Sequence, residues 1–209
     1  KFSPAYYLHG EDDYLKEDAL RHLLAAAVDP ATRDFNLDQR RGTGLDAESL
    51  GSLLGMPPMM AERRVVVIRD VTALRKDTRA GLDKYLESPA ADLLLVLTAP
   101  ADAKPDKALE RATVPVDCRS LTGAQVPKWI VSRVERDLGA RIAPAAVELL
   151  QSAVGGDLAQ LALEIEKLRA YAGAGEIDEA AVSAAVGIGR EETLRHLLDA
   201  IAAIDVTRA

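Results

Sequence analysis

Short apolar runs alternate with longer segments of helical periodicity over the first 120 residues of the chain. Apolar residues recur at helical spacing from Leu15 to Ala27, and shorter helices are predicted at 47–55 and 78–88, the second stopping before Pro89. The runs with strand character lie at residues 5–10, 34–40, 63–70, 92–99 and 113–119. This alternation is typical of a parallel sheet covered by helices. The third and fourth runs are continuously apolar, which predicts central strands buried on both faces.

From Leu121 onward the strand signal disappears and the apolar positions follow helical spacing alone. Helices are predicted at residues 121–140, 143–156, 157–173, 178–187 and 190–205. In the third of these, Asp157 is expected to cap the N-terminus. Its apolar stripe consists of Leu158, Leu161, Ile165 and Leu168. Its charged residues, most of which are expected to face solvent, are Glu164, Glu166, Lys167 and Arg169.

The last predicted helix carries an apolar stripe from Leu194 to Ile204 that ends where the chain ends. Such a face needs an apolar partner, so it either folds back onto the helical bundle or opens a further domain that this chain lacks. We therefore expect an α/β domain over residues 1–120 and a small all-helical domain over 121–187. Residues 188–209 would be the start of a further helical domain, or a linker helix.

Charge and composition narrow the classes of function. The net charge of -7 argues against a protein that mainly binds nucleic acid or anionic lipid without specificity, since both need a basic face. The single cysteine, Cys118, cannot form an internal disulfide, and no apolar run approaches the roughly 20 residues of a membrane span. The N-terminus lacks the features of a signal peptide. A reducing cytoplasm is the expected location.

The segment YYLHGEDDYLKEDAL, residues 6–20, has the strand–loop–helix layout that holds phosphate in nucleotide-binding folds. A phosphate-binding loop of the form GxxxxGK[ST] also needs further glycines, a lysine and a hydroxyl, and of this pattern we count only Gly10. Glu11, Asp12 and Asp13 would repel a triphosphate. We expect Asp12 or Asp13 to cap the following helix instead.

An alternative interpretation is a Mg²⁺-dependent phospho-receiver or phosphatase-like domain. It rests on the acids after the first strand together with Asp70, Thr98 and the Lys104–Pro105 pair. The spacing is loose, and the helical second half has no role in such a protein. The histidines His9, His22 and His196 are scattered and show no zinc-site spacing, and Cys118 has no activating neighbour in sequence. No catalytic site, metal site or cofactor is expected.

Met59 and Met60 follow two prolines in the segment LGMPPMMAERRVVVI, residues 54–68. From composition, two methionines here are expected to fill the core; the alternative is an adaptable apolar plug for a partner's pocket. A basic cluster lies nearby in sequence and is expected to be a solvated face, with DNA contact as the weaker option. Its members are Arg63, Arg64, Arg69, Arg75, Lys76 and Arg79.

The chain resembles the delta subunit of the bacterial DNA polymerase III clamp loader over nearly its whole length. Besides residues 6–20, the resemblance is carried by these segments: DFNLD, MPPMMAERRVVVIRDV, LDKYLESPAADLLLVLTA, LTGAQVPKWI and VGGDLAQLALEIEKLRAYAG. It implies an AAA+-like α/β domain, a helical lid domain and a C-terminal collar domain, the last of which we expect to be absent from this chain. It also implies an accessory polymerase subunit without catalysis of its own, whose partners are the sliding clamp (beta subunit), the gamma/tau and delta prime subunits and, through them, DNA.

In this family a hydrophobic pair before an A-x-R segment grips the clamp, and the subunit springs one ring interface open. On this sequence the pair falls on Met59 and Met60, with Pro58 and Arg63 as supporting contacts. Members often carry Leu and Phe there, so the methionines differ in type but not in apolar character. Within the basic cluster, Arg75, Lys76 and Arg79 are the candidates for DNA contact, which stays the weaker option.

Three positions that handle phosphate in ATPases lack the expected residue. The loop after the first strand has only Gly10, and Asp70 is followed by Val71 rather than by a second acid. In the helical domain, Ala159 stands where active AAA+ proteins commonly have an arginine. These absences favour a relative that does not hydrolyse ATP.

Overall fold

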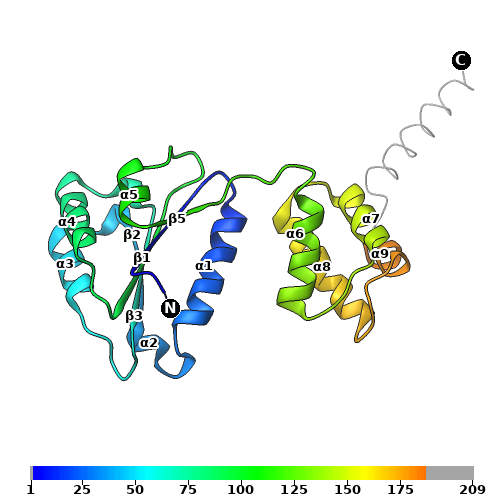
Figure 1. Cartoon of the computed structure of the whole chain (residues 1–209), viewed down its shortest axis with the longest axis horizontal. Helices are drawn as coiled ribbons and strands as arrows, with labels where there is room; N and C mark the ends of the chain where they lie inside the picture. Colours follow the sequence, from blue (N-terminus) through cyan, green and yellow to red (C-terminus); the bar gives the residue numbers. More distant parts are fainter. Residues whose placement is uncertain (1, 187–209) are drawn as a thin grey trace, which may run out of the picture. The chain divides into compact units, whose positions relative to one another are not determined.

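The computed structural model describes residues 2–186 of the chain. Its contacts divide the chain into two compact units, with the division between Ser120 and Leu121 (Figure 1). Among residues 2–186, none of the helices is both long enough and apolar enough to cross a membrane. The predicted stripe from Leu194 to Ile204, and His196 within it, lie outside the described residues.

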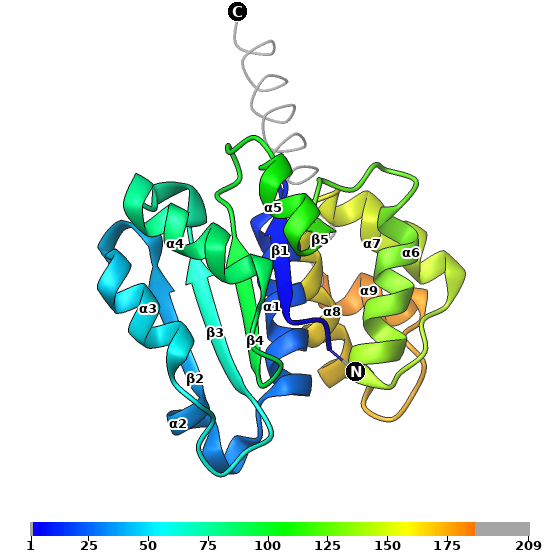
Figure 2. The same cartoon turned by 60° about the vertical axis from the view of Figure 1, so that its left-hand side comes forward.

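The first unit is built on a five-stranded parallel sheet in the order β2-β3-β4-β1-β5 (Figure 2). The strands are β1 (Ala5–His9), β2 (Leu37–Arg41), β3 (Arg64–Arg69), β4 (Leu93–Thr98) and β5 (Val114–Asp117). All of β4 is buried, and in β3 only Arg69 is partly exposed. The prediction that these two strands are central and covered on both faces is therefore confirmed.

The strand order contradicts the phospho-receiver alternative. Receiver domains have a doubly wound sheet of order 2-1-3-4-5, in which the first strand lies between the second and the third. Here β1 lies between β4 and β5, while β3 separates β2 from β4. The acids that follow β1 and β3 are thus separated by β4, whereas in a receiver these two strands are neighbours. The receiver interpretation is wrong.

Helices cover the two faces of the sheet. On one face α1 (Asp13–Ala27) packs Leu20 and Leu24 against Leu8 and the odd-numbered valines of β3. The other face is covered by α3 (Ala47–Gly55), α4 (Lys76–Glu87) and α5 (Lys107–Ala112). Figure 1 shows α3 and α4 across the sheet from α1. Successive residues of β1, β3 and β4 alternate between the two cores, as the period of a strand requires.

The second predicted strand starts later than expected. Residues 34–36 belong to the short helix α2 (Arg33–Asn36), and the strand begins only at Leu37. The Asn36 side chain explains the difference, because its Nδ2 donates back to the carbonyl of Thr32, at 3.1 Å, and closes the helical turn. A local bond of this kind competes with sheet pairing. Three 3-10 turns complete the first unit: Pro30–Thr32, Gly42–Gly44 and Val71–Ala73.

The second unit is all-helical over its described residues. Its helices are α6 (Val126–Ser132), α7 (Pro144–Val154), α8 (Leu158–Ala172) and α9 (Glu179–Ala185), with a π-helical turn at Arg133–Asp137. The helix predicted from Leu121 begins only at Val126, because Pro127 has no N–H to donate and is tolerated only in a first turn.

The stripe of α8 is buried as predicted, and Asp157 caps this helix by accepting from the backbone N–H of Gln160 at 3.0 Å. Glu164 differs from the expectation that the charged residues face solvent, since only 8 % of it is exposed. Its carboxylate accepts from Gln160 Nε2 at 3.1 Å and pairs with Lys167 at 2.6 Å. Neighbouring donors allow this burial, since a paired carboxylate costs far less to bury than a free one.

Candidate functional site

The loop after β1 is tied to the end of β5. Gly10 has φ +119°, and a Cβ there would collide with the Cys118 carbonyl group and come within 2.8 Å of the Arg119 nitrogen. Two hydrogen bonds hold this close approach: Cys118 N–H donates to the His9 carbonyl at 2.7 Å, and Asp12 N–H donates to the Cys118 carbonyl at 3.0 Å. Only glycine fits such a position without strain.

Asp12 caps α1, as predicted for Asp12 or Asp13. Its Oδ1 accepts from the backbone N–H of Leu15 at 2.9 Å, and Asp13 pairs with Lys16 at 2.8 Å in the first turn. Phosphate-binding loops depend on backbone N–H groups that converge on the ligand. Here the N–H groups of Asp12 and Leu15 are already hydrogen-bonded within the protein.

Lys16, in the first turn of α1, is a buried residue that the sequence pattern did not single out. It follows Gly10 by six residues, the spacing of glycine and lysine in GxxxxGK, although Leu15 and Glu17 replace the second glycine and the hydroxyl residue. Its side chain is buried, and Nζ donates to the Ala99 carbonyl, just after β4, at 2.9 Å. The lysine thus joins α1 to β4, and its ammonium group is used within the fold.

Asp70, an acid of the receiver interpretation, makes a structural contact instead. Asp70 takes the left-handed conformation at the end of β3, with φ 55°, and its Oδ1 accepts from the Thr72 hydroxyl at 2.9 Å. Thr98 is buried, and Lys104 lines a cavity of 580 Å³ at the end of β1 together with His9 and Glu110. His9 is a buried residue that stacks on Tyr7, 5.0 Å between ring centroids, and lies 3.5 Å from Glu110.

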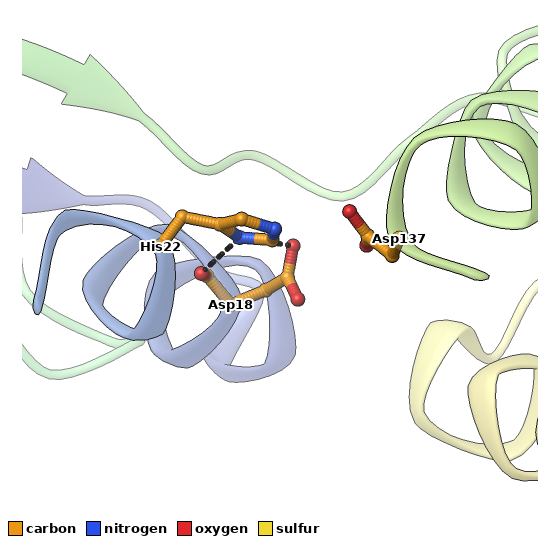
Figure 3. A group of neighbouring side chains, drawn as sticks. All are labelled: Asp18, His22 and Asp137. Carbon is orange, nitrogen blue, oxygen red and sulfur yellow. Dashed lines mark hydrogen bonds and ion pairs between the residues drawn. The ribbon is translucent and has the colours of Figure 1, made fainter. Parts of the chain in front are cut away.

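His22 lies on α1 one turn from Asp18 (Figure 3). Its Nδ1 is 2.7 Å from the Asp18 carbonyl oxygen and 3.4 Å from a carboxylate oxygen of the same residue. Asp137, also labelled in Figure 3, belongs to the second unit, where it pairs with Arg133 at 2.6 Å and Arg136 at 2.9 Å. Ala159 lies exposed in the first turn of α8.

Cys118 is a buried thiol at the end of β5. Burial raises its pKa to about 11, so the thiol stays protonated near neutral pH. The thiolate is the reactive form of cysteine, which agrees with the expectation that Cys118 is not a nucleophile.

Alkylation tests this protection of Cys118 directly. Near pH 8, iodoacetamide is expected to modify the folded chain more than about 100-fold more slowly than the chain unfolded in urea, where the thiol pKa returns to about 8.5. The signal is unambiguous because the chain has one cysteine. The folded chain keeps the thiol proton to a higher pH than the unfolded chain does. The contribution of the protonated thiol to the free energy of unfolding should therefore be present at neutral pH and lost as pH rises from about 8.5 to 11. Folded and unfolded rates within about tenfold of each other would contradict the burial of this thiol.

Met59 and Met60 lie on the surface, so the expectation that they fill the core is wrong. Met59 is 50 % exposed and Met60 82 %, and nearby Met56 is 46 % exposed. The short connection between α3 and β3 explains this exposure. Pro57 and Pro58 cannot continue α3, and β3 begins only at Arg64, so the methionines lie on the turn between the two elements. Exposure is what the alternative, an apolar plug, requires. We call residues 56–60 the methionine turn.

The basic residues around β3 and α4 do not form one solvated face. Arg64 is buried, donates to the Phe35 carbonyl at 2.6 Å and pairs with Asp38, and Arg69 pairs with Glu17. Their guanidinium groups anchor neighbouring elements of the fold. Arg63 is partly buried and stacks over the Phe2 ring.

Of the three candidates for DNA contact, Arg75 and Lys76 are exposed, while Arg79 is held between two carboxylates. It lies 2.8 Å from Asp83 and 2.6 Å from Asp106, and the Arg79 guanidinium lowers the pKa of Asp106. The Arg79 charge is thus neutralised within the fold, which leaves Arg75 and Lys76 as the exposed cations of this set.

Comparison with known proteins identifies similar chains. A family model described as DNA polymerase III, delta subunit, matches residues 6–116, more than half of the chain. The chain is 27% identical over 190 residues to DNA polymerase III subunit delta of Bacillus subtilis, with 81% of this chain and 52% of that protein covered. It is 25% identical over 210 residues to the subunit delta of Escherichia coli, with 94% and 59% covered. The chain therefore spans somewhat over half the length of these relatives.

Solved structures agree with the sequence matches. The DNA clamp loader delta protein of Bacillus subtilis superposes with a TM-score of 0.71 at 26% identity, covering 88% of this chain and 58% of that one. RuvB of Thermotoga maritima superposes with a TM-score of 0.54 at 18% identity, covering 88% and 61%. At that identity the second match establishes the fold alone, which is that of an AAA+ protein.

Proposed function

The chain belongs to the DNA polymerase III delta subunit family, and on that premise we propose that it binds the ring-shaped sliding clamp through Met59 and Met60 and opens the ring for loading onto DNA during replication. Its loader partners would be the gamma/tau and delta prime subunits, and it would meet DNA through the loader. Residues 1–120 would carry the clamp contact, 121–187 would act as the lid, and 188–209 would lead into a collar domain.

The observation that carries this proposal is the exposure of two adjacent methionines on a turn next to a buried strand. Isolated apolar residues are common on protein surfaces, but neighbouring ones indicate an interaction site. Methionine adapts its shape to an apolar pocket because its side chain is unbranched and polarizable. Pro58 and Arg63, both partly buried, flank the pair and would support the contact.

Opening of the ring needs no chemistry in this subunit. A protein that binds the open ring more tightly than the closed ring shifts the clamp toward the open form by that difference in affinity. The methionine pair would be the anchor, and the surface around it would press on the ring interface. The contacts of the loop after β1 support a subunit that does not hydrolyse ATP, because Lys16 and two N–H groups of the loop are engaged within the fold.

A binding experiment with purified proteins tests the proposal. The chain, immobilised on a sensor, is expected to bind the sliding clamp of its own organism saturably in the absence of nucleotide. Addition of Mg²⁺ and ATP should change Kd by less than about twofold, because a ligand that the protein does not bind cannot shift an equilibrium. A folded chain with no measurable affinity for the clamp would overturn the proposal; a tenfold dependence on ATP would overturn the assignment as a subunit that does not use nucleotide.

A further inference from the structure

Helix α2 lies directly against the methionine turn. We infer that α2 is the second half of the clamp-contact surface, in which Asn36 is a positioning residue for the methionine turn and Phe35 is a further contact residue. This inference rests on the proposed function for its partner, an apolar pocket on the sliding clamp. Its structural part, the hold of Asn36 on the turn, can be tested without that partner.

Asn36 binds both backbone groups of Met59. Its Oδ1 accepts from the Met59 N–H at 2.7 Å, and its Nδ2 donates to the Met59 carbonyl at 2.8 Å. The second hydrogen of Nδ2 is used by the Thr32 carbonyl at 3.1 Å, so both amide hydrogens have acceptors. Only 2 % of Asn36 is exposed, so these bonds are shielded from water. The Asn36 side chain therefore fixes the backbone of the methionine turn, 23 residues away in sequence, by pairing with both the N–H and the carbonyl of one residue.

The residue next to this contact has an uncommon backbone conformation. Met60 has φ 52°, in the left-handed region that a residue with a Cβ rarely takes. Such a conformation persists when surrounding structure holds it, and strained residues of this kind gather at functional sites. Met60 itself is 82 % exposed, so its own side chain has little packing to hold it. The bonds of Asn36 to the preceding residue provide that hold.

Phe35 is an exposed apolar residue on α2, next in sequence to the residue that holds the methionine turn. It is 52 % exposed, and it precedes Asn36, which is bonded to Met59. A hydrogen bond fixes the Phe35 backbone, because its carbonyl accepts from the buried Arg64 side chain at 2.6 Å. Of the seven large apolar residues that are exposed in the described part of the chain, four belong to this region: Phe35, Met56, Met59 and Met60. Aromatic residues and methionine are enriched at protein interfaces, where a few of them carry most of the binding energy.

The first test examines the free protein. The only methionines of the chain are the three of the methionine turn, so a spectrum with ¹³C-labelled methionine methyl groups reports on this surface alone. In Asn36→Ala, the Met59 and Met60 methyl signals are expected to move toward averaged, solvent-like positions. Hydrogen exchange at the Met59 amide should be at least about tenfold faster than in the native chain. Unchanged methyl signals and unchanged exchange in a folded Asn36→Ala variant would overturn the positioning role.

The second test is a double-mutant cycle on clamp affinity. Asn36→Ala alone is expected to weaken clamp binding about tenfold, because the turn must be ordered on binding. In a background that already carries Met59→Ala and Met60→Ala, the same substitution should change affinity by less than about twofold, since Asn36 acts through the methionines. An equal loss in both backgrounds would show a general structural effect and would contradict the inference.

A matched pair of aromatic substitutions tests the contact by Phe35. Phe35→Ala is expected to weaken clamp binding about 5- to 10-fold. The control is Tyr171→Ala on α8, which removes an aromatic residue of similar exposure, 63 %, from the second unit and should leave affinity unchanged. If the methionine substitutions weaken binding but Phe35→Ala does not, the contact role of Phe35 is refuted while the proposed function stands. If the native chain does not bind the clamp at all, the proposed function fails, and the methyl spectrum and amide exchange still decide the role of Asn36.

Discussion

Replacing Met59 and Met60 together by alanine is expected to weaken binding to the sliding clamp at least about 100-fold. Burial of the exposed parts of the two side chains, 50 % of Met59 and 82 % of Met60, contributes about 2–4 kcal/mol before the costs of ordering, and a 100-fold loss corresponds to about 2.8 kcal/mol. The double substitution by aspartate should abolish binding, because a carboxylate in an apolar pocket loses its hydration without a partner. Both side chains are at least half exposed in the free chain, so its fold should tolerate either change.

Surface plasmon resonance or isothermal titration with the clamp measures this effect, and thermal unfolding verifies that the variants are folded. The matched control replaces Leu163 and Tyr171 of α8 by alanine, which removes two exposed apolar side chains from the second unit. That control should bind like the native chain. Native affinity in a folded Met59→Ala, Met60→Ala chain would show that the methionine turn does not contact the clamp.

Gly10→Ala is expected to lower the free energy of unfolding by at least about 3 kcal/mol. The new Cβ would overlap the Cys118 carbonyl group, which is backbone directly after β5 and cannot move without disturbing the Cys118–His9 and Asp12–Cys118 hydrogen bonds. The backbone at φ +119° also lies outside the range that alanine takes readily. Both effects destabilise the folded state.

Urea denaturation followed by circular dichroism measures this loss, with Gly51→Ala as the control. Gly51 lies inside α3, where an added Cβ would meet no described atom within 4 Å apart from its chain neighbours and the backbone of its own helix. Alanine there should raise the free energy of unfolding by about 0.5–1 kcal/mol, because glycine is a poor helix former. A Gly10→Ala chain within about 1 kcal/mol of native stability would contradict the close packing of the loop after β1 against the end of β5.

Periodicity along the chain identified the elements of the sheet but could not order them. All five strands were located, and continuous apolar runs marked β3 and β4 as interior, because burial on both faces leaves no polar positions. The placement of β1 between β4 and β5 depends on long-range pairing, which no local pattern encodes. That order is what separates this fold from a receiver domain.

Buried polar residues were the main source of error. Charged residues usually lie on the surface, yet Lys16, Arg64 and Glu164 are buried. Lys16 and Arg64 bind carbonyl groups that are distant in sequence, and Glu164 pairs with a lysine on the next helical turn. Asn36 looked like part of a strand, and its side chain instead closes a helical turn and binds Met59. Such side chains are placed by the acceptors and donors that the fold brings to them.

The sequence by itself determined the segments that alternate in the first half, the helical second half and a helix cap at Asp12 or Asp13, of which the structure selects Asp12. These features follow from local rules: the periods of strand and helix, the limits that proline imposes, and the preference of aspartate for helix N-termini. The sequence also located two methionines after two prolines, but its composition favoured the core for them. Only the tertiary structure decided that they are exposed, because exposure depends on what packs around a residue. The same holds for the loop after β1 and the start of α1, where the sequence contains a glycine, three acids and a lysine. Only the fold determined that Lys16 donates a hydrogen bond to the Ala99 carbonyl and that Asp12 N–H donates to the Cys118 carbonyl after β5.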